Sequence, residues 1–275
     1  MLATSPSDKR RPDGAQRHIA IRVLTWNLFH GRSLPPAGRA LAEEFAVRLG
    51  GWEWDVALLQ EVPPWWPLLL ARSAGAEQRT ALTSRNTGLM LRRALAERWP
   101  DLVKSNGGSC NAILARRMIA EHRAVRLRIW PERRVAQLAR LGDGTCLVNF
   151  HGSARVALAE AELERLWELA LAWAGEAPLI VGGDLNLRSP RAPDSSIGHV
   201  ARRDVDHLFA RGLEPSAEAD LLDRHVLLDK DQPVELSDHV PLVVRVRALS
   251  REPWPGNRLP RGVMVETGSM PPRSR

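Results

Sequence analysis

Short apolar runs recur along the chain, and turn-forming or charged residues bound most of them. The runs lie at residues 19–26, 55–60, 111–117, 145–151, 178–184 and 239–246. Their length and their content of branched aliphatic residues are those of buried strands rather than of helices. The pattern therefore predicts a protein whose core consists largely of β-sheet.

Helical periodicity separates several of these strands and is clearest over residues 155–174. Apolar residues there recur three and four apart, which places them on one core-facing side of a helix. They are Val156, Ala159, Leu163, Leu166, Ala170 and Trp173. We expect Ser153 to cap the N-terminus of this helix and Gly175 to end it. Residues 36–49 and 63–72 are also predicted to be helical, each with proline at its start.

A hairpin is predicted where the turn 142–144, with the sequence Gly-Asp-Gly, separates strands at about residues 135–141 and 145–151. Antiparallel hairpins of this kind are mixed along the chain with alternating strands and helices. That mixture favours an α/β (α+β) fold of stacked mixed sheets with helices outside over a simple doubly wound sheet.

Composition indicates one globular domain with a tail at each end. Hydrophobic residues make up 44% and charged residues 26% of the 275 residues, as in ordinary globular proteins. Residues 1–18 and 250–275 are dominated by Pro, Gly, Ser and Arg and show no sustained apolar period, so we expect disordered tails. The folded domain is expected to span residues 19–249.

The net charge of +7 gives only weak support for nucleic-acid binding, because the two predicted tails carry +2 and +3 of it. No apolar run reaches the roughly 18 residues needed to cross a bilayer. The N-terminal segment also lacks the apolar stretch of an export signal. We therefore expect a cytoplasmic protein in which Cys110 and Cys146 are reduced thiols.

Residues able to bind a metal ion or a phosphate stand at the ends of the predicted strands. Strands that end in carboxylates, amides and imidazoles are what a site at one edge of a sheet requires. Oxygen ligands without cysteine thiolates favour a hard ion such as Mg²⁺ or Mn²⁺ over zinc, and such an ion indicates phosphate chemistry. The residues are Asn27, Glu61, His151, Asp184, Asn186, Asp238 and His239.

Each of these residues also has a structural interpretation. Asn27 can cap a turn, and residues 182–186 can form an ordinary turn after a strand, since Gly, Asp and Asn are common turn formers. Residues 237–239 can be solvent-facing loop residues, and His151 can be a core histidine whose hydrogen bonds are satisfied. The predicted metal and phosphate site is absent only if all of these structural interpretations are correct at once.

Seven motifs are spread over nearly the whole predicted domain. They are LTWNL at 24–28, LLQEV at 58–62, NAILARR at 111–117, VNFHGS at 148–153, VGGDLNLR at 181–188, DVDHLFARGL at 204–213 and LSDHVPL at 236–242. In this order they resemble the endonuclease/exonuclease/phosphatase (DNase I-like) superfamily, which includes pancreatic-type DNases, abasic-site endonucleases, neutral sphingomyelinases and inositol-polyphosphate phosphatases. The resemblance implies a four-layered α/β sandwich of two packed mixed β-sheets flanked by helices.

By this resemblance, Glu61 is the principal ligand of a Mg²⁺ or Mn²⁺ ion, assisted by Asn27 and Asp238. The ion would neutralise the charge that develops on the phosphate and on the leaving oxygen. Asp184 would orient or deprotonate the attacking water, while Asn186 would hold the nucleophile or a phosphate oxygen.

The resemblance also implies that two histidines act on the phosphate. His239 would lie against it as acid, base or hydrogen-bond donor, with Asp206 fixing the tautomer and raising the basicity of the ring. His151 matches a second phosphate-contacting histidine of DNase-like members. Arg134 is a candidate phosphate clamp, although a solvated side chain is an equally good interpretation in so arginine-rich a strand.

The chain departs from the abasic-site endonucleases at two points. It contains no tyrosine, whereas those enzymes use one near the phosphate, and Phe29 stands where they carry an additional acidic residue. Both departures count against abasic-site repair. His30 is a candidate substrate-binding residue or simply the start of a loop, and Asn111 is expected to make a structural hydrogen bond.

These features predict a metal-dependent hydrolase of phosphoric esters, first of all a phosphodiesterase or nuclease with nucleic acid as a candidate substrate. The alternative is a phosphatase or phospholipase-type esterase acting on a small phosphorylated or lipid substrate. Trp65 and Trp66 would then form an aromatic rim beside the metal, although they equally suit a helix start and core packing. A catalytically inactive binding module of the same fold is a third interpretation, which predicts missing metal or nucleophile residues; none of the principal ones is missing.

Overall fold

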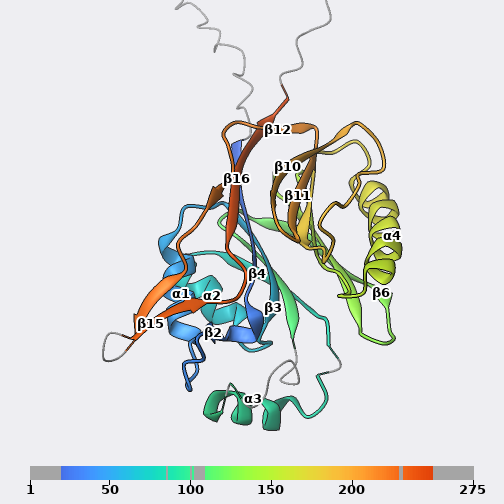
Figure 1. Ribbon diagram of the computed structural model, residues 1–275. Helices are drawn as coiled ribbons and strands as arrows, with labels where there is room; N and C mark the ends of the chain where they lie inside the picture. Colours follow the sequence, from blue (N-terminus) through green and yellow to red (C-terminus); the bar gives the residue numbers. More distant parts are fainter. Residues whose placement is uncertain (1–19, 85, 100, 102–108, 229–231, 250–275) are drawn as a thin grey trace, which may run out of the picture.

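In the computed structural model, two β-sheets pack face to face and helices cover their outer faces (Figure 1). The structure describes residues 20–249 apart from residues 85, 100, 102–108 and 229–231. The predicted tails therefore lie outside the described residues. The layers confirm the predicted four-layered α/β sandwich.

The first sheet has seven strands, and its central pair is parallel. β1 and β3 run in parallel with Asn27 opposite Gln60, while the other neighbouring strands pair antiparallel. In spatial order the sheet contains β12 (Leu213–Pro215), β16 (Leu242–Ala248), β1 (Ala20–Asn27), β3 (Val56–Val62), β5 (Cys110–Ala115) and β4 (Glu77–Leu82), with β13 (Asp220–Leu221) paired to β16.

The second sheet has six strands and is also built on a central parallel pair. β8 and β9 place His151 opposite Asp184. In spatial order the sheet contains β10 (Ile197–Arg203), β11 (Asp206–Arg211), β9 (Leu179–Asp184), β8 (Cys146–His151), β7 (Arg134–Leu141) and β6 (Ile119–Arg128). The β7–β8 hairpin turns over residues 142–144, as predicted.

The side chains of the central strands pack alternately into two layers of core, because successive strand residues point to opposite faces. In β1, Ile21 and Val23 pack between the sheets, whereas Trp26 packs outward against α1 and α2. In β8, Leu147 packs inward and Val148 outward against α4. The helices are α1 (Ala42–Gly51), α2 (Pro67–Ala74), α3 (Leu89–Arg98) and α4 (Val156–Ala174).

Two predicted helices begin later than expected. Residues 35–41, directly before α1, form bends and irregular structure, and the preceding β2 (Ser33–Leu34) pairs with β15 (Gln232–Leu236). β15 also pairs with β14 (His225–Leu228), so the three strands form a third, unpredicted sheet. Residues 63–66 form a turn closed by the Trp66 N–H and the Pro63 carbonyl at 2.9 Å, so α2 begins only at Pro67. The last strand also starts late, at Leu242, and leaves residues 239–241 in the preceding loop.

Ser153 does not cap α4, so this prediction was wrong. Arg155 is the residue before the helix, and the Ser153 amide and hydroxyl instead donate hydrogen bonds to Glu162 at 2.9 and 2.8 Å. The predicted end at Gly175 is confirmed, with its N–H bonded to the Leu171 carbonyl at 3.0 Å.

Three further expectations concern the rest of the chain. Cys110 and Cys146 are buried and free, as predicted. Asn111 makes the expected hydrogen bond, donating from Nδ2 to the Val135 carbonyl at 3.3 Å. In the part of the chain that the structure describes, no helix is both long and apolar enough to cross a membrane.

Candidate active site

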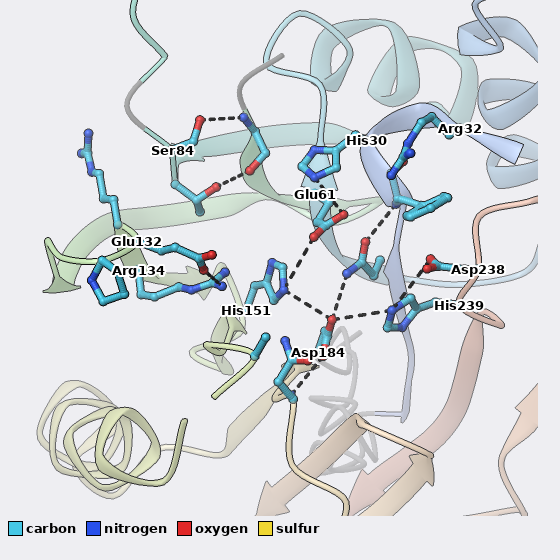
Figure 2. A pocket seen from close by; sticks show the side chains of 18 residues that line it. His30, Arg32, Glu61, Ser84, Glu132, Arg134, His151, Asp184, Asp238 and His239 are labelled. Atoms are coloured by element: carbon cyan, nitrogen blue, oxygen red, sulfur yellow. Dashed lines mark hydrogen bonds and ion pairs between the residues drawn. The ribbon is translucent and has the colours of Figure 1, made fainter. Parts of the chain in front are cut away.

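The carboxyl ends of the two parallel strand pairs meet at one edge of the sandwich, around a cavity of about 490 Å³. Figure 2 shows the polar side chains of this edge pointing toward one another. All of the predicted site residues except Asp206 line the cavity, namely Asn27, His30, Glu61, Arg134, His151, Asp184, Asn186, Asp238 and His239. Asp206 lies behind His239 and contacts it.

An irregularity in β3 turns Glu61 into the cavity. The pairing of β3 with β5 shifts between Leu59 and Val62, and Glu61 has a left-handed backbone with φ of 50°. Such a conformation is costly for a residue other than glycine and is found mostly at functional sites. Burial, followed by the charges of Asp184 and Asp238, raises the pKa of Glu61 to about 7. A neighbouring cation would relieve that unfavourable environment.

Asn27 connects the ends of the two sheets. Its Nδ2 donates a hydrogen bond to Asp184 Oδ2 at 2.9 Å, and its Oδ1 accepts one from the Phe29 N–H at 2.9 Å. An amide oxygen has two lone pairs, so Asn27 can cap this turn and still offer an oxygen to an ion.

Asp184 is held by close contact between β8 and β9. Gly183 has φ of +134°, and a Cβ there would lie 1.9 Å from the Phe150 carbonyl oxygen, so only glycine fits. Asp184 Oδ1 accepts a hydrogen bond from the Asn186 N–H at 3.0 Å, and Asn186 Nδ2 donates to the Gly152 carbonyl at 3.0 Å. Burial raises the pKa of Asp184. The sequence GGDLN therefore builds a fixed turn and also presents a carboxylate.

His239 is oriented by Asp206 across the interface between the sheets. Its Nδ1 donates to Asp206 Oδ2 at 2.8 Å, while its Nε2 lies 3.7 Å from Asp184 Oδ2. Its backbone N–H donates to Ser237 Oγ at 3.0 Å. Burial lowers the pKa of His239, but the hydrogen bond and the charge of Asp206 outweigh it and raise the pKa to about 9. The imidazole is therefore protonated at neutral pH.

His151 lies deeper in the cavity and is uncharged. Its Nε2 is 3.4 Å from Asp184 Oδ2 and 3.8 Å from Glu61 Oε1. Burial, together with the charge of Arg134, holds the pKa of His151 well below its usual value. Asp238 lies at the more open side, with 40% of its side chain exposed.

Arg134 is buried in the cavity wall, so the interpretation as a solvated side chain was wrong. Its guanidinium forms an ion pair with Glu132, and its Nε has no hydrogen-bond partner among the described residues. The pairing with Glu132, two residues earlier, keeps the positive charge in the wall rather than in solvent. A guanidinium in this position can contact an anionic substrate.

Trp65 and Trp66 do not line the cavity, so the prediction of an aromatic rim was wrong. Both belong to the core on the helix side of the first sheet. The Trp66 ring lies 5.4 Å from that of Phe45, and a Cβ on Gly31 would lie only 2.2 Å from it. Core packing is therefore the correct interpretation of this pair.

Sequence reasoning missed one wall of the cavity and one buried acid behind it. The wall residues are Thr83, Ser84, Ser109, Pro131, Glu132, Arg133 and Ala154. Isolated loop residues of these types carry no periodic or motif signal, whereas Glu162 could have been found as a charge beside the apolar stripe of its helix. Glu162 pairs with Arg128 and fixes Ser153, and thereby holds the loop that follows His151.

The donors around Glu61 fit a hard divalent ion. Its carboxylate, that of Asp238 and the oxygen of Asn27 are ligands of the kind that Mg²⁺ and Mn²⁺ prefer. The pKa of Glu61 is raised first by burial and then by the charges of Asp184 and Asp238, and a bound cation would offset both effects.

A second set of possible ligands is formed by Asp184, Asp206 and His239, each with one ligand atom within 4.8 Å of the others. His239 Nδ1 already donates to Asp206, and Asp184 Oδ2 already accepts from Asn27. We therefore favour the set around Glu61. Among the residues that the structure describes, its carboxylate is paired only with the imidazoles of His30 and His151.

A family model described as the Endonuclease/Exonuclease/phosphatase family matches residues 24–239. This span runs from the first motif to the last, and it contains the candidate site residues. No curated protein matches the chain.

Solved structures share the fold. The endonuclease/exonuclease/phosphatase of Beutenbergia cavernae has a TM-score of 0.61 at 18% identity, covering 83% of this chain and 72% of that one. A family protein from Bacteroides thetaiotaomicron has a TM-score of 0.65 at 14% identity, covering 85% and 100%. D. rerio TDP2 complexed with a single-strand DNA product has a TM-score of 0.58 at 16% identity, covering 82% and 98%.

Proposed function

This chain belongs to the endonuclease/exonuclease/phosphatase family, and we propose that it is a divalent-metal-dependent phosphodiesterase that hydrolyses a P–O bond with activated water. The proposal is carried by one observation: the hydrogen-bonded pair of His239 and Asp206 lies beside Asp184 in a cavity that Glu61 also lines. A protonated donor, a buried carboxylate and a candidate cation site together meet the needs of attack on a phosphate.

Asp184 is the group that activates the attacking water. Burial raises its pKa, which strengthens the carboxylate as a base. The Asn186 N–H holds one of its oxygens at 3.0 Å, so the carboxylate keeps one orientation. As the water oxygen attacks phosphorus, its proton passes to Asp184, and the Asn186 amide lies beside the same carboxylate to hold the nucleophile.

His239 acts on the phosphate as a proton donor. Its Nδ1–H is bonded to Asp206 at 2.8 Å, which leaves Nε2–H free to contact a phosphate oxygen or to protonate the leaving oxygen. The neutral ring of His151 and the guanidinium of Arg134 line the same cavity and provide further contacts to the phosphate. A divalent ion held by Glu61, Asp238 and Asn27 would supply charge stabilisation at the phosphate oxygens.

Nucleic acid is the substrate class that we propose. One structural neighbour, D. rerio TDP2, is complexed with a single-strand DNA product. In this chain, the hydroxyl groups of Thr83, Ser84 and Ser109 extend the cavity beside Arg134, and such groups suit the phosphates and sugars of a strand. Trp66 is buried and Trp65 packs against the same core, so this pair does not form the aromatic rim that was the argument for a lipid substrate.

The test is hydrolysis of bis(p-nitrophenyl) phosphate, p-nitrophenyl phosphate, single-strand DNA and plasmid DNA, each with Mg²⁺, Mn²⁺ or EDTA. We expect metal-dependent cleavage of the diester and of DNA, lost in Asp184→Asn and kept in Asp223→Asn, which changes an exposed aspartate. Activity restricted to the monoester would replace the proposal with a phosphatase. Metal binding without hydrolysis of any substrate would favour an inactive binding module.

A further inference from the structure

The loop after β1 holds His30 in an unusual backbone conformation that aims its ring at Glu61. Phe29 and His30 have φ of 48° and 54°, so two successive residues other than glycine are left-handed. This is costly, and it persists only where the surroundings enforce it. Gly31, whose added Cβ would lie 2.2 Å from the Trp66 ring, packs the loop tightly onto the core.

The two side chains of this loop point in different directions. The Phe29 ring lies under the Arg32 guanidinium, 3.7 Å from the guanidinium carbon to the ring centre. The His30 ring instead reaches the cavity, with Nε2 3.1 Å from Glu61 Oε2 and only 13% of its side chain exposed (Figure 2). Its Nδ1 is buried and has no hydrogen-bond partner among the described residues. The strained loop therefore places the His30 imidazole beside Glu61, the candidate metal ligand.

The distance between the two side chains has the value expected for neighbouring ligands of one ion. Two atoms bound to an octahedral ion at about 2.1 Å and at right angles to each other lie about 3 Å apart. His30 Nε2 and Glu61 Oε2 are separated by 3.1 Å. An uncharged imidazole carries the lone pair that coordination requires.

On the basis of the proposed function, we propose that His30 is a nitrogen ligand of the ion held by Glu61 and that it makes the site prefer Mn²⁺ to Mg²⁺. Mg²⁺ binds oxygen ligands and keeps several waters, whereas imidazole suits transition-metal ions. A site with carboxylate, amide and imidazole donors therefore binds Mn²⁺ more tightly than one with oxygen donors alone.

Electron spin-echo spectroscopy of the full chain loaded with Mn²⁺ tests this assignment without substrate. We expect the echo modulation of a directly bound histidine nitrogen in the wild type and its loss in His30→Asn. Asparagine tolerates a left-handed backbone and offers an oxygen, so the loop is expected to keep its conformation. The modulation is expected to remain in His151→Asn and in His225→Asn, which changes an exposed histidine.

The competing arrangement is a ring N–H of His30 that donates to Glu61 and merely positions it. That arrangement gives a Mn²⁺ ion with oxygen ligands only, so an unmodulated wild-type spectrum would overturn the assignment. Modulation that persists in His30→Asn would equally overturn it, because the nitrogen would then belong to His151 or His239. Should His30→Asn fail to fold, modulation retained in both His151→Asn and His239→Asn would still leave His30 as the bound nitrogen.

Titration calorimetry with Mn²⁺ and with Mg²⁺ tests the proposed preference. We expect the Kd for Mn²⁺ to rise about tenfold or more in His30→Asn, while the Kd for Mg²⁺ changes much less. An equal loss of affinity for both ions would contradict the preference. These results are independent of hydrolysis. An active enzyme whose Mn²⁺ has only oxygen ligands would support the proposed function and refute the assignment of His30. An inactive chain whose Mn²⁺ is bound by the His30 nitrogen would refute the proposed function and support the assignment.

Discussion

Asp206 and His239 belong to opposite sides of the sandwich, yet their side chains meet at 2.8 Å between Oδ2 and Nδ1. Asp206 begins β11 in the second sheet, directly opposite Asp184 of β9. His239 precedes β16 in the first sheet. The pair therefore forms only when the two sheets are packed in their native arrangement, which links the candidate chemistry to the fold itself.

Asp206→Asn is expected to reduce kcat on a phosphodiester by about 10² to 10⁴-fold while leaving the affinity for metal unchanged. The amide cannot hold the imidazolium as the carboxylate does, so the pKa of His239 should fall from about 9 toward its ordinary value. Steady-state kinetics gives the first result and a magnetic-resonance titration of the His239 ring gives the second.

Asp204→Asn is the matched control, because Asp204 is an exposed aspartate two residues away. Its kcat should equal that of the wild type. A similar loss in both variants, or an unchanged His239 titration in Asp206→Asn, would remove Asp206 from its proposed role.

Glu61→Gln is expected to stabilise the metal-free protein and to abolish its stabilisation by metal. The pKa of Glu61 is raised from 4.5 to about 7, chiefly by burial, so its folded form binds protons more tightly than its unfolded form. Its contribution to stability is therefore present below pH 4.5 and lost as the pH rises through about 7. At pH 8 the free energy of unfolding of metal-free Glu61→Gln should exceed that of the metal-free wild type by at most about 3 kcal/mol.

Thermal unfolding with EDTA and with Mn²⁺ measures both effects. Wild type should show a rise in Tm on adding Mn²⁺, and Glu61→Gln should not. Glu164→Gln, which changes an exposed residue of α4, should behave as the wild type does. A rise in Tm with Mn²⁺ that survives in Glu61→Gln would place the ion elsewhere.

The strands at the centre of both sheets and the polar residues at their ends were predictable because both leave a local signal, whereas β4 and β10 were not predicted. The runs that end at Asn27, His151 and Asp184 are apolar, short and followed by turn residues, so strand and site were indicated by the same segments. The family motifs then supplied their order. Asp206 was indicated by its motif alone, since its partner His239 is 33 residues away in the sequence.

The features that sequence reasoning missed depend on contacts between distant segments. The small sheet pairs Leu34 with Glu235, which lie far apart in the sequence, so no local pattern indicates it. The burial of Arg134 likewise depends on the cavity wall, to which distant segments of the chain contribute. Trp65 and Trp66 were ambiguous because a site and a core both use aromatic residues.

Gly183→Ala is expected to destabilise the fold by at least about 3 kcal/mol or to prevent soluble expression. An added Cβ would lie 1.9 Å from the Phe150 carbonyl oxygen, and the backbone φ of +134° is strained for alanine. Because β8 and β9 pair in parallel at this point, relief would require the strands that carry His151 and Asp184 to separate.

Gly198→Ala in β10 of the same sheet is the control for Gly183→Ala. A Cβ there would lie 3.8 Å from its nearest neighbour, the Ala210 carbonyl oxygen, which is an ordinary contact. Urea unfolding should place Gly198→Ala within about 0.5 kcal/mol of the wild type. Equal stability of the two variants would mean that β8 and β9 are farther apart than in this structure.

His207 is expected to make the protein lose stability as the pH falls from 6.5 to about 4. The ring is fully buried, with Nε2 donating to the Leu187 carbonyl at 2.7 Å and Nδ1 3.0 Å from His199 Nε2. Burial lowers the pKa of His207 to about 4, and the charges of His199 and Arg202 act in the same direction. The hydrogen bond to Leu187 raises the pKa but does not outweigh burial. Between these pH values the unfolded chain binds a proton at this histidine and the folded chain does not. The free energy of unfolding therefore rises with pH throughout this range.

Replacing the ring with an uncharged amide, as in His207→Gln, should therefore flatten the dependence of unfolding free energy on pH between 4 and 6.5. The difference in free energy of unfolding between the wild type and His207→Gln should decrease by at most about 3 kcal/mol from pH 7 to pH 4. Urea titrations across this range measure it. His225→Gln, which changes an exposed histidine, serves as the control. Parallel curves for wild type and His207→Gln would show that other buried histidines, such as His30 and His151, account for the acid sensitivity instead.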